Sequence, residues 1–184
     1  MIIFSGGAVG TDLVFEKYAE LFQIPIIAYT FDNHKTKTQH SFMLSNEKLK
    51  EAMEFVITAN NRLQREFPSK NVYINKLLER DYYIIRYATI VIAFGYFDQV
   101  TNEVDGGTAW GIEMAKDKRI PIYLFNLDEY KWYGWNYNEP TRFFETARPM
   151  VTKNEKIAGI GTRKVKFHLT RIESEIKTIL DIKK

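Results

Sequence analysis

The chain has 184 residues, of which 45% are hydrophobic and 15% aromatic, and 26 basic against 23 acidic residues give a net charge of +3. This composition excludes a chain that is disordered over most of its length, and it suits one hydrophobic core, so we expect a single domain over 1–184. The absence of cysteine excludes disulfides and thiolate chemistry, and no apolar stretch approaches the ~18–20 residues of a membrane span, so we expect a cytoplasmic protein.

Apolar runs alternate along the chain with stretches of helical period, which is typical of a parallel sheet covered by helices. We therefore predict an α/β fold, a single Rossmann-like domain whose mainly parallel sheet carries helices on both faces. Thr11 is expected to cap the first helix. The predicted strands are residues 1–4, 25–29, 89–94 and 121–125, and the predicted helices are residues 11–22, 46–66, 72–86, 108–118 and 166–182.

Two segments show no clear period. Residues 30–45 are expected to form an irregular connection, and residues 126–150 are rich in aromatic side chains that would form a lid, a subunit contact or a flap of the core. If nothing covered it, the aromatic segment would be an exposed apolar patch. We therefore expect a homo-oligomer, or a lid over a ligand.

Charge is unevenly distributed along the chain. Residues 151–184 hold nine basic and four acidic residues, a net charge of +5, whereas the first 150 residues hold 17 basic and 19 acidic residues, a net charge of −2. A basic end suits nucleic acid or a phosphorylated ligand, but the sequence pI of about 8.9 falls short of the value of ~9 that is typical of nucleic-acid-binding domains. A solvated helix face is therefore favoured over a nucleic-acid partner.

The segment SGGAVGTD, residues 5–12, lies between the first predicted strand and the first predicted helix. Glycines let the backbone turn sharply and approach a ligand, and a helix N-terminus favours an anion by ~0.3–1 kcal/mol. This turn either captures phosphate or is a plain strand-to-helix connection. Its candidate ligand-binding residues are Ser5, Gly6, Gly7, Gly10, Thr11 and Asp12.

A second glycine pair lies where the helix 108–118 is expected to begin. The segment GGTAWGIE, residues 106–113, follows the buried strand 89–94 after a loop at 96–105, and we expect the two glycine turns to leave neighbouring strand ends and to face one ligand. Trp110 is either a core aromatic or a side chain that stacks on a base. The candidate ligand-binding residues here are Gly106, Gly107, Thr108, Trp110 and Glu113.

Two further candidates are less specific. Residues 159–163, GIGTR, form either a third phosphate loop that ends in the cation Arg163 or a turn before the last helix. Asp32 and His34 follow the second strand, where they would contact a ribose hydroxyl or a base edge, or lie in solvent. The three histidines have no metal-binding spacing, so we expect no metal site and no cofactor; Mg²⁺ bridging phosphates is an unsupported alternative.

These motifs, together with ER at 79–80, ATIVIAFG at 88–95 and DGGTAWGIEMA at 105–115, resemble the SLOG superfamily over most of the chain. The resemblance implies a Rossmann-like domain that recognises nucleotides or nucleotide-derived ligands. The superfamily includes the Lonely Guy phosphoribohydrolases, the molybdenum-cofactor carrier-like proteins and the DNA-processing protein that loads single-stranded DNA. The opening SGGxxGxD is most similar to the last two branches.

The phosphoribohydrolases carry GG-x-x-G, an arginine before the central strand, and P-G-G-x-G-T-x-x-E. The resemblance implies that Arg80 holds phosphate or leaving-group charge and that Glu113 stabilises an oxocarbenium-like ribose and positions or activates water. Asp105, Ala109 and Trp110 depart from the third motif, and the loop 96–105 is an insertion relative to it. Alternatively, Arg80 and Glu113 form a structural ion pair, or Glu113 lies on a solvated helix face.

We therefore predict binding of a nucleotide-derived small molecule, such as a cyclic nucleotide or an ADP-ribose-type signal, by a sensor, carrier or sequestering protein. The enzymatic alternative is a nucleoside-monophosphate phosphoribohydrolase that uses Arg80 and Glu113, and the second alternative is single-stranded-DNA binding. The abundance of Ile, Lys, Asn, Tyr and Phe is typical of AT-rich bacterial or phage genomes, so the prediction includes a phage protein that acts in the host cytoplasm.

Overall fold

The computed structural model describes residues 1–181, which form an eight-stranded sheet, a two-stranded hairpin and five helices. The strands from β3 to β7 run parallel, and β8 and β9 continue the sheet as an antiparallel meander. The α/β prediction with a mainly parallel sheet is therefore confirmed. In spatial order the strands are β3 (Ser41–Leu44), β2 (Ile26–Phe31), β1 (Ile2–Ser5), β10 (Lys156–Gly161), β4 (Ile90–Gly95), β7 (Ile122–Asn126), β8 (Lys131–Trp135) and β9 (Phe143–Thr146).

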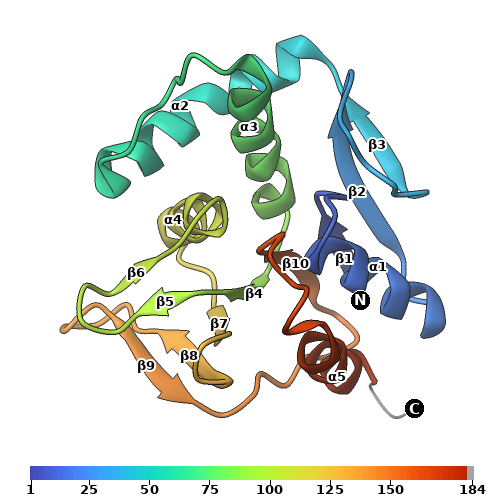
Figure 1. Cartoon of the computed structure of the whole chain (residues 1–184), viewed down its shortest axis with the longest axis vertical. Coiled ribbons are helices and arrows are strands. Elements are labelled where there is room, and N and C mark those ends of the chain that lie inside the picture. Colours follow the sequence, from blue (N-terminus) through green and yellow to red (C-terminus); the bar gives the residue numbers. More distant parts are fainter. Residues whose placement is uncertain (182–184) are drawn as a thin grey trace.

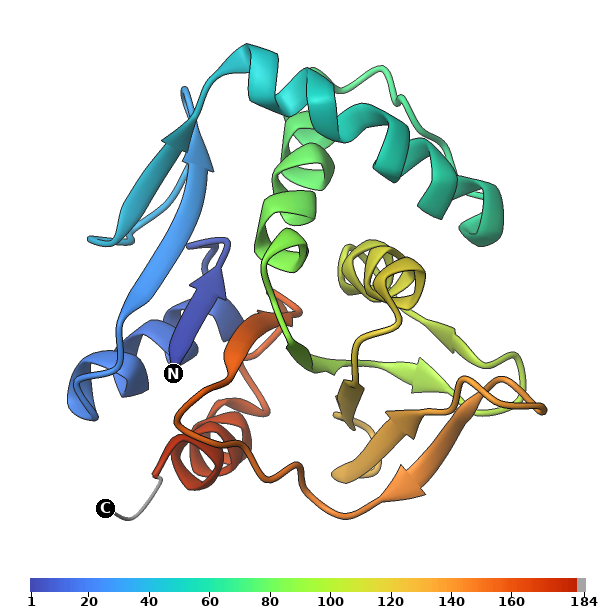
Figure 2. The same cartoon turned by 180° about the vertical axis from the view of Figure 1, so that it is seen from behind.

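Helices cover both faces of the sheet, as the alternating pattern predicts (Figure 1). One face carries α1 (Thr11–Leu21) and α5 (Leu169–Leu180), and the other carries α2 (Asn46–Leu63), α3 (Val72–Arg86) and α4 (Thr108–Lys118). Two apolar layers result, one containing Phe15 and Ile176 and the other containing Val56, Ile84 and Ile112. Figure 2 shows that the sheet curves around α3 and α4.

The strongest sequence patterns predict their helix and strand correctly. Helix α3 has the predicted bounds, and every residue of β4 is buried. The expected cap at Thr11 is wrong, because Gly10 occupies the capping position and the Thr11 hydroxyl instead donates to the Thr162 carbonyl at 3.0 Å. The predicted end of the last helix at Ile182 lies outside the described residues.

Strand β10 is absent from the prediction, although it lies at the centre of the sheet, between β1 and β4. Its sequence, KIAGIG, contains two glycines, which weaken a strand signal. Helix α1 packs so closely on β10 that a Cβ atom at Gly159 would lie 2.7 Å from the Phe15 ring. The first glycine turn follows β1 and the second follows the hairpin after β4, and β10 lies between these two strands. The expectation that the two turns leave neighbouring strands is therefore wrong.

Both segments without a clear period contain strands. Part of the connection 30–45 is the edge strand β3, and the segment 126–150 forms the end of β7, together with β8 and β9. Most of its aromatic side chains lie in the core or pack against it, so the reason for expecting a subunit contact or a lid does not hold. The buried ones are Trp132, Tyr133 and Phe143, and Trp135 and Tyr137 pack against the core layer that contains Tyr133 and Phe143.

The predicted loop 96–105 contains a small hairpin, β5 (Phe97–Asp98) and β6 (Glu103–Val104), which precedes α4. Arg65, which follows α2, donates to the Val104 carbonyl at 2.9 Å and to the Gly106 carbonyl at 2.7 Å. The second glycine turn is thus held by the segment that follows α2. No helix in the described part of the chain combines the length and the apolarity needed to cross a membrane.

Candidate functional site

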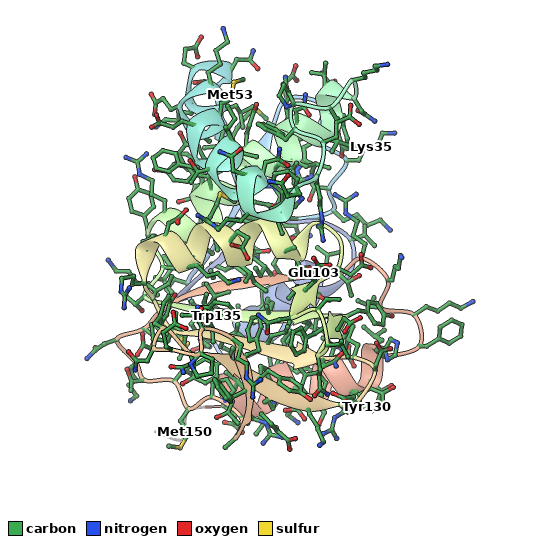
Figure 3. All side chains as sticks on the ribbon, turned by 90° about the vertical axis from the view of Figure 1, so that its left-hand side faces the viewer. Lys35, Met53, Glu103, Tyr130, Trp135 and Met150 are labelled. Atoms are coloured by element: carbon green, nitrogen blue, oxygen red, sulfur yellow. The ribbon has the colours of Figure 1, made fainter. Side chains whose placement is uncertain are left out.

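A cleft of about 390 Å³ lies at the carboxyl ends of the central strands, between α3 and the N-terminus of α4. From β1 the sheet extends to β2 and β3, and from β4 it extends in the other direction to β7, so the cleft lies where the strand order reverses. Ligands of open α/β sheets bind at such a switch point. In Figure 3, Lys35 and Tyr130, which follow β2 and β7, mark the side of the molecule where the parallel strands end. Met150, which precedes β10, marks the opposite side, where they begin.

One wall of the cleft is a face of α3. Residues spaced by three or four positions lie on one side of a helix, and the cleft-lining residues Ile74, Leu77, Leu78, Asp81 and Ile84 have this spacing. Four of these five side chains are apolar, and Ile160 of β10 adds to them. The cleft therefore combines an apolar wall with a charged end.

The charged end is built around Arg80, which is only 3% exposed. Its guanidinium fills the space above Gly6, where a Cβ atom would lie 1.4 Å from Arg80 Nη1. Nη1 lies 3.0 Å from Asp81 Oδ1 and 3.9 Å from Asp12 Oδ2, whereas the buried Nε has no hydrogen-bond partner among the described residues. A buried donor without a partner costs about 1–3 kcal/mol, so an acceptor supplied by a ligand would stabilise this end of the cleft.

Both carboxyl groups beside Arg80 have pKa values above their ordinary range. Burial raises the pKa of Asp12, although the Arg80 charge and the Ala8 N–H, which donates to Oδ2 at 3.2 Å, oppose the shift. Burial also raises the pKa of Asp81 to about 6, against the charge of Arg80 and with a contribution from Asp12. Protonation of Asp81 below about pH 6 makes the charged end more favourable for an anion.

The first glycine turn is filled by the protein itself. A Cβ atom at Gly7 would lie 2.8 Å from Thr36 Oγ1, and one at Gly10 would lie 2.7 Å from the Thr162 carbonyl oxygen. The Ser5 hydroxyl donates to Glu16 at 3.3 Å, on α1. Of the residues predicted here for ligand binding, only Asp12 lines the cleft, with Ala8 beside it; Ser5, Gly6, Gly7, Gly10 and Thr11 do not.

The second glycine turn is open. Apart from the glycines, their chain neighbours and the adjacent helix backbone, no atom of residues 1–181 lies within 4 Å of the positions where Cβ atoms would stand at Gly106 and Gly107, and both glycines line the cleft with Thr108. Gly106 has a φ of +64°, which favours glycine, and Gly107 caps α4 without a side-chain hydrogen bond. The first N–H groups of α4 have no intrahelical acceptor, which makes this helix N-terminus suited to an anion.

The segment after β10 supplies two further cations. Arg163 and Lys164 line the cleft with Gly161 and Thr162, and neither cation makes an ion pair within residues 1–181. The interpretation of residues 159–163 as a glycine phosphate loop is corrected, because Gly159 and Gly161 belong to β10. Arg163 nevertheless reaches the cleft.

Glu113 and Trp110 lie outside the lining of the cleft. Glu113 Oε2 accepts from Arg62 Nε at 2.7 Å, and Oε1 accepts from Lys116 Nζ, so both oxygens of this buried carboxylate are occupied. Trp110 is 5% exposed and packs edge-on against Phe67, with the ring centroids 5.8 Å apart. Arg80 and Glu113 therefore neither pair with each other nor line the same cleft.

The predicted residues after β2 also lie outside the lining. Asp32 is exposed and accepts from the Asn33 side-chain amide at 2.9 Å. His34 stacks on Phe31, with centroids 4.7 Å apart, and both of its ring nitrogens are buried without a hydrogen-bond partner in the part of the chain that the structure describes. Burial, followed by the charges of Arg80 and Arg163, lowers the pKa of His34 to about 4, so the ring is neutral near pH 7.

Several cleft residues were missed from the sequence. Asp81 directly follows the ER pair, and its spacing from Ile74, Leu77 and Leu78 would have placed it on the apolar face of the helix. Tyr96 and Asp105, which flank the hairpin, had no signal because the hairpin itself was not predicted. Tyr96 also binds His168, with 3.2 Å between its hydroxyl and Nε2.

The basic residues of the C-terminal part do not form one surface. Lys153 precedes β10 and Arg163 follows it, so they lie at opposite ends of a strand about 20 Å long. Arg171 pairs with Glu175 on α5 at 2.9 Å. Over residues 1–181, no three or more His, Asp or Glu side chains are grouped in a way that could hold a metal ion.

Comparisons with protein-family models, with curated proteins and with solved structures give no match to this chain. What the protein binds is therefore inferred from the cleft itself.

Proposed function

We propose that the cleft binds a nucleotide-derived small molecule, with its anionic group at the charged end and its base against the apolar wall of α3. The observation that carries this proposal is the buried Arg80 guanidinium at the wall of the cleft, with a donor that no residue of the described chain satisfies. An anionic oxygen would supply the missing acceptor. The open N-terminus of α4 favours the same charge, as do Arg163 and Lys164, which form no ion pair with another described residue.

The dimensions and the lining of the cleft support a small ligand of mixed character. Ligand pockets commonly measure about 300–1,000 Å³ and combine apolar walls with a few polar groups, and the cleft measures about 390 Å³. The aliphatic face of α3 would contact a base or a sugar face. A ligand with a phosphate, a cyclic phosphate or an ADP-ribose-type pyrophosphate at one end and a base at the other would fit the charged end and the apolar wall of the cleft.

Binding without hydrolysis is favoured over the phosphoribohydrolase alternative. That reaction would need Glu113 beside the ribose, whereas Glu113 is held by Arg62 and Lys116 away from the cleft lining. A role as sensor, carrier or sequestering protein requires only the binding that the cleft chemistry supports.

The proposal is tested by isothermal titration calorimetry with AMP, cyclic AMP and ADP-ribose, together with mass spectrometry of any ligand released from the purified protein by heat. We expect at least one of these ligands to bind and to remain intact. Arg163→Ala should weaken binding by tenfold or more, because it removes a charged donor from the cleft. Arg142→Ala is the matched control, since it removes the same charge from an exposed position outside the cleft.

Two outcomes would contradict the proposal. If no ligand is released and none of the three binds, the cleft does not serve nucleotide-derived anions. If free base and ribose phosphate accumulate from AMP, the protein is a hydrolase and not a binding protein.

A further inference from the structure

Two carboxyl groups share one guanidinium at the charged end of the cleft. Arg80 Nη1 lies 3.0 Å from Asp81 Oδ1 and 3.9 Å from Asp12 Oδ2. The side chains of Arg80, Asp12 and Asp81 are 4%, 8% and 19% exposed, and all three residues line the cleft. The three groups therefore form one buried cluster that a ligand in the cleft would meet.

The charge of this cluster conflicts with anion binding as long as both carboxyls are ionised. Two carboxylates and one guanidinium give the cluster a net charge of −1, in a buried site where like charges repel strongly. Uptake of one proton would make the cluster neutral and leave the cations around it free to attract an anion.

The groups that face the cluster come from every element around the cleft. Arg163 and Lys164 after β10 are cations, Asp105 before α4 is a carboxylate, Tyr96 after β4 carries a phenol, and His34 after β2 is neutral near pH 7. Of these surrounding groups, only Arg163 lowers the pKa of Asp12 and of Asp81, as Arg80 within the cluster also does. Glu16 on α1 is a further carboxyl near Asp12, and burial together with the Asp12 charge raises its pKa as well, but it accepts hydrogen bonds from Ser5 and Thr38 and does not line the cleft.

Asp81 is better suited than Asp12 to hold the proton. Asp12 lies in the first turn of α1, where the helix dipole favours a negative charge, and its Oδ2 accepts from the Ala8 N–H at 3.2 Å. Asp81 lies in the interior of α3, and apart from Arg80 Nη1 at 3.0 Å no donor of the described residues faces its carboxyl. Burial raises the pKa of both carboxyls, but Asp81 has fewer donors to stabilise its charge, so it is the better site for the proton.

We propose that the cleft takes up one proton with its anionic ligand, and that Asp81 holds it as a neutral carboxylic acid whose O–H donates to an anionic oxygen of the ligand. The proton comes from solvent and returns to solvent when the ligand leaves. This inference rests on the proposed function and adds that Asp81 determines how binding depends on pH. Burial already raises the pKa of Asp81 to about 6, and a bound anion would raise it further.

The inference is tested by calorimetric titration of ADP-ribose and cyclic AMP in two buffers that differ in ionisation enthalpy, at about pH 7. The phosphates of these probes are diesters and do not themselves titrate near neutral pH. We expect the protein to take up close to one proton per bound ligand, and its affinity to fall by up to tenfold per pH unit above about pH 6. In Asp81→Asn the uptake should vanish and the affinity should become independent of pH, because the amide is a donor that does not titrate.

Glu79→Gln is the matched control, because Glu79 is a buried carboxyl of the same helix that does not line the cleft. Proton uptake should persist in this variant. Binding of either probe without proton uptake, with equal pH profiles for the wild type and Asp81→Asn, would overturn the inference and leave the proposed function standing. If neither probe binds, the proposed function fails instead.

A ¹³C-NMR titration of the carboxyl groups in the free protein gives a second measurement that needs no ligand. We expect one carboxyl resonance to titrate near pH 6 in the wild type and in Glu79→Gln, and to be missing in Asp81→Asn. If Asp12 and Asp81 both titrate below about pH 4.5, the pair does not hold a proton and the inference is overturned.

Discussion

The two glycine-rich turns of this protein both precede a helix, but they face different surroundings. Around the first turn the space above Gly6 and Gly10 is occupied by Arg80 and by the backbone at Thr162 and Arg163. At the second turn the space above Gly107 is empty and opens into the cleft. A glycine pattern therefore indicates that something approaches the backbone closely, but it does not say whether this is a ligand or the protein itself.

The largest difference between the turns should appear in stability. Gly10→Ala places a Cβ atom 2.7 Å from a backbone oxygen at a φ of +117°, so we expect a loss of about 3–5 kcal/mol in the free energy of unfolding. Gly107→Ala should change it by no more than about 0.5 kcal/mol, because φ is −67° and no neighbour is near. Urea denaturation of both variants measures the contrast, and equal losses would show that the first turn is not packed as described.

Ligand affinity should depend on the guanidinium behind the first turn. Arg80→Lys keeps the charge but loses the Nε donor and the planar fork, so we expect binding of the best nucleotide probe to weaken by about tenfold to 100-fold. Arg86→Lys is the control, since Arg86 is exposed on the same helix and lies outside the cleft. Calorimetry measures the ligand affinity of both variants. An unchanged affinity in Arg80→Lys would show that Arg80 does not contact the ligand.

Stability should also depend on pH through the carboxyl beside Arg80. A pKa of about 6 in the folded state, against an ordinary value of 3.8, means that Asp81 contributes stability below about pH 3.8 and that this contribution is lost as the pH rises through 6. Asp81→Asn should therefore stabilise the protein by about 1–2 kcal/mol at about pH 7.5 and have little effect near pH 4. Urea denaturation at the two pH values measures this, and a variant that is less stable at pH 7.5 would contradict the expectation.

The smallest effect is expected behind the second turn, on the outer side of α4. Glu113→Gln keeps the shape of the side chain and weakens its contacts with Arg62 and Lys116, so we expect a loss of about 1 kcal/mol in stability and unchanged ligand affinity. Denaturation and calorimetry measure the two quantities. If Glu113→Gln lost ligand affinity while its stability was unchanged, Glu113 would be shown to belong to the functional site.

The sequence predicts most strongly those elements whose pattern is decided locally. The bounds of α3 and the buried strand β4 follow from amphipathic period and from an uninterrupted β-branched run. Strand β10 escapes prediction because its glycines are explained only by the close packing of Phe15 and Thr11, which come from a distant part of the chain. Likewise, the sequence does not reveal the role of the aromatic residues of β8 and β9, because they pack in the core only in the assembled sheet.

The candidate site was predicted in part for the same reason. The glycines, Arg80 and Arg163 stand out because their residue types are distinctive in their positions. Asp81 was overlooked, since its importance comes from sharing a guanidinium with Asp12, and these two residues are far apart in sequence. Conversely, Glu113 fits a motif but is turned towards α2, an arrangement that depends on the place of Arg62 in the fold.

The central position of β10 has a consequence for the order in which the protein can be assembled. Strands β1 and β4 do not pair with each other: β1 pairs with β2 and β4 pairs with β7, and the other edge of each is covered by β10, the last strand of the sheet in chain order. During synthesis the two halves of the sheet must therefore wait, each with an open edge, until residues 156–161 have left the ribosome. The cleft, whose lining includes Ile160 and the residues after it, is completed in the same step. A growing chain thus completes the cleft and covers the open edges of β1 and β4 together.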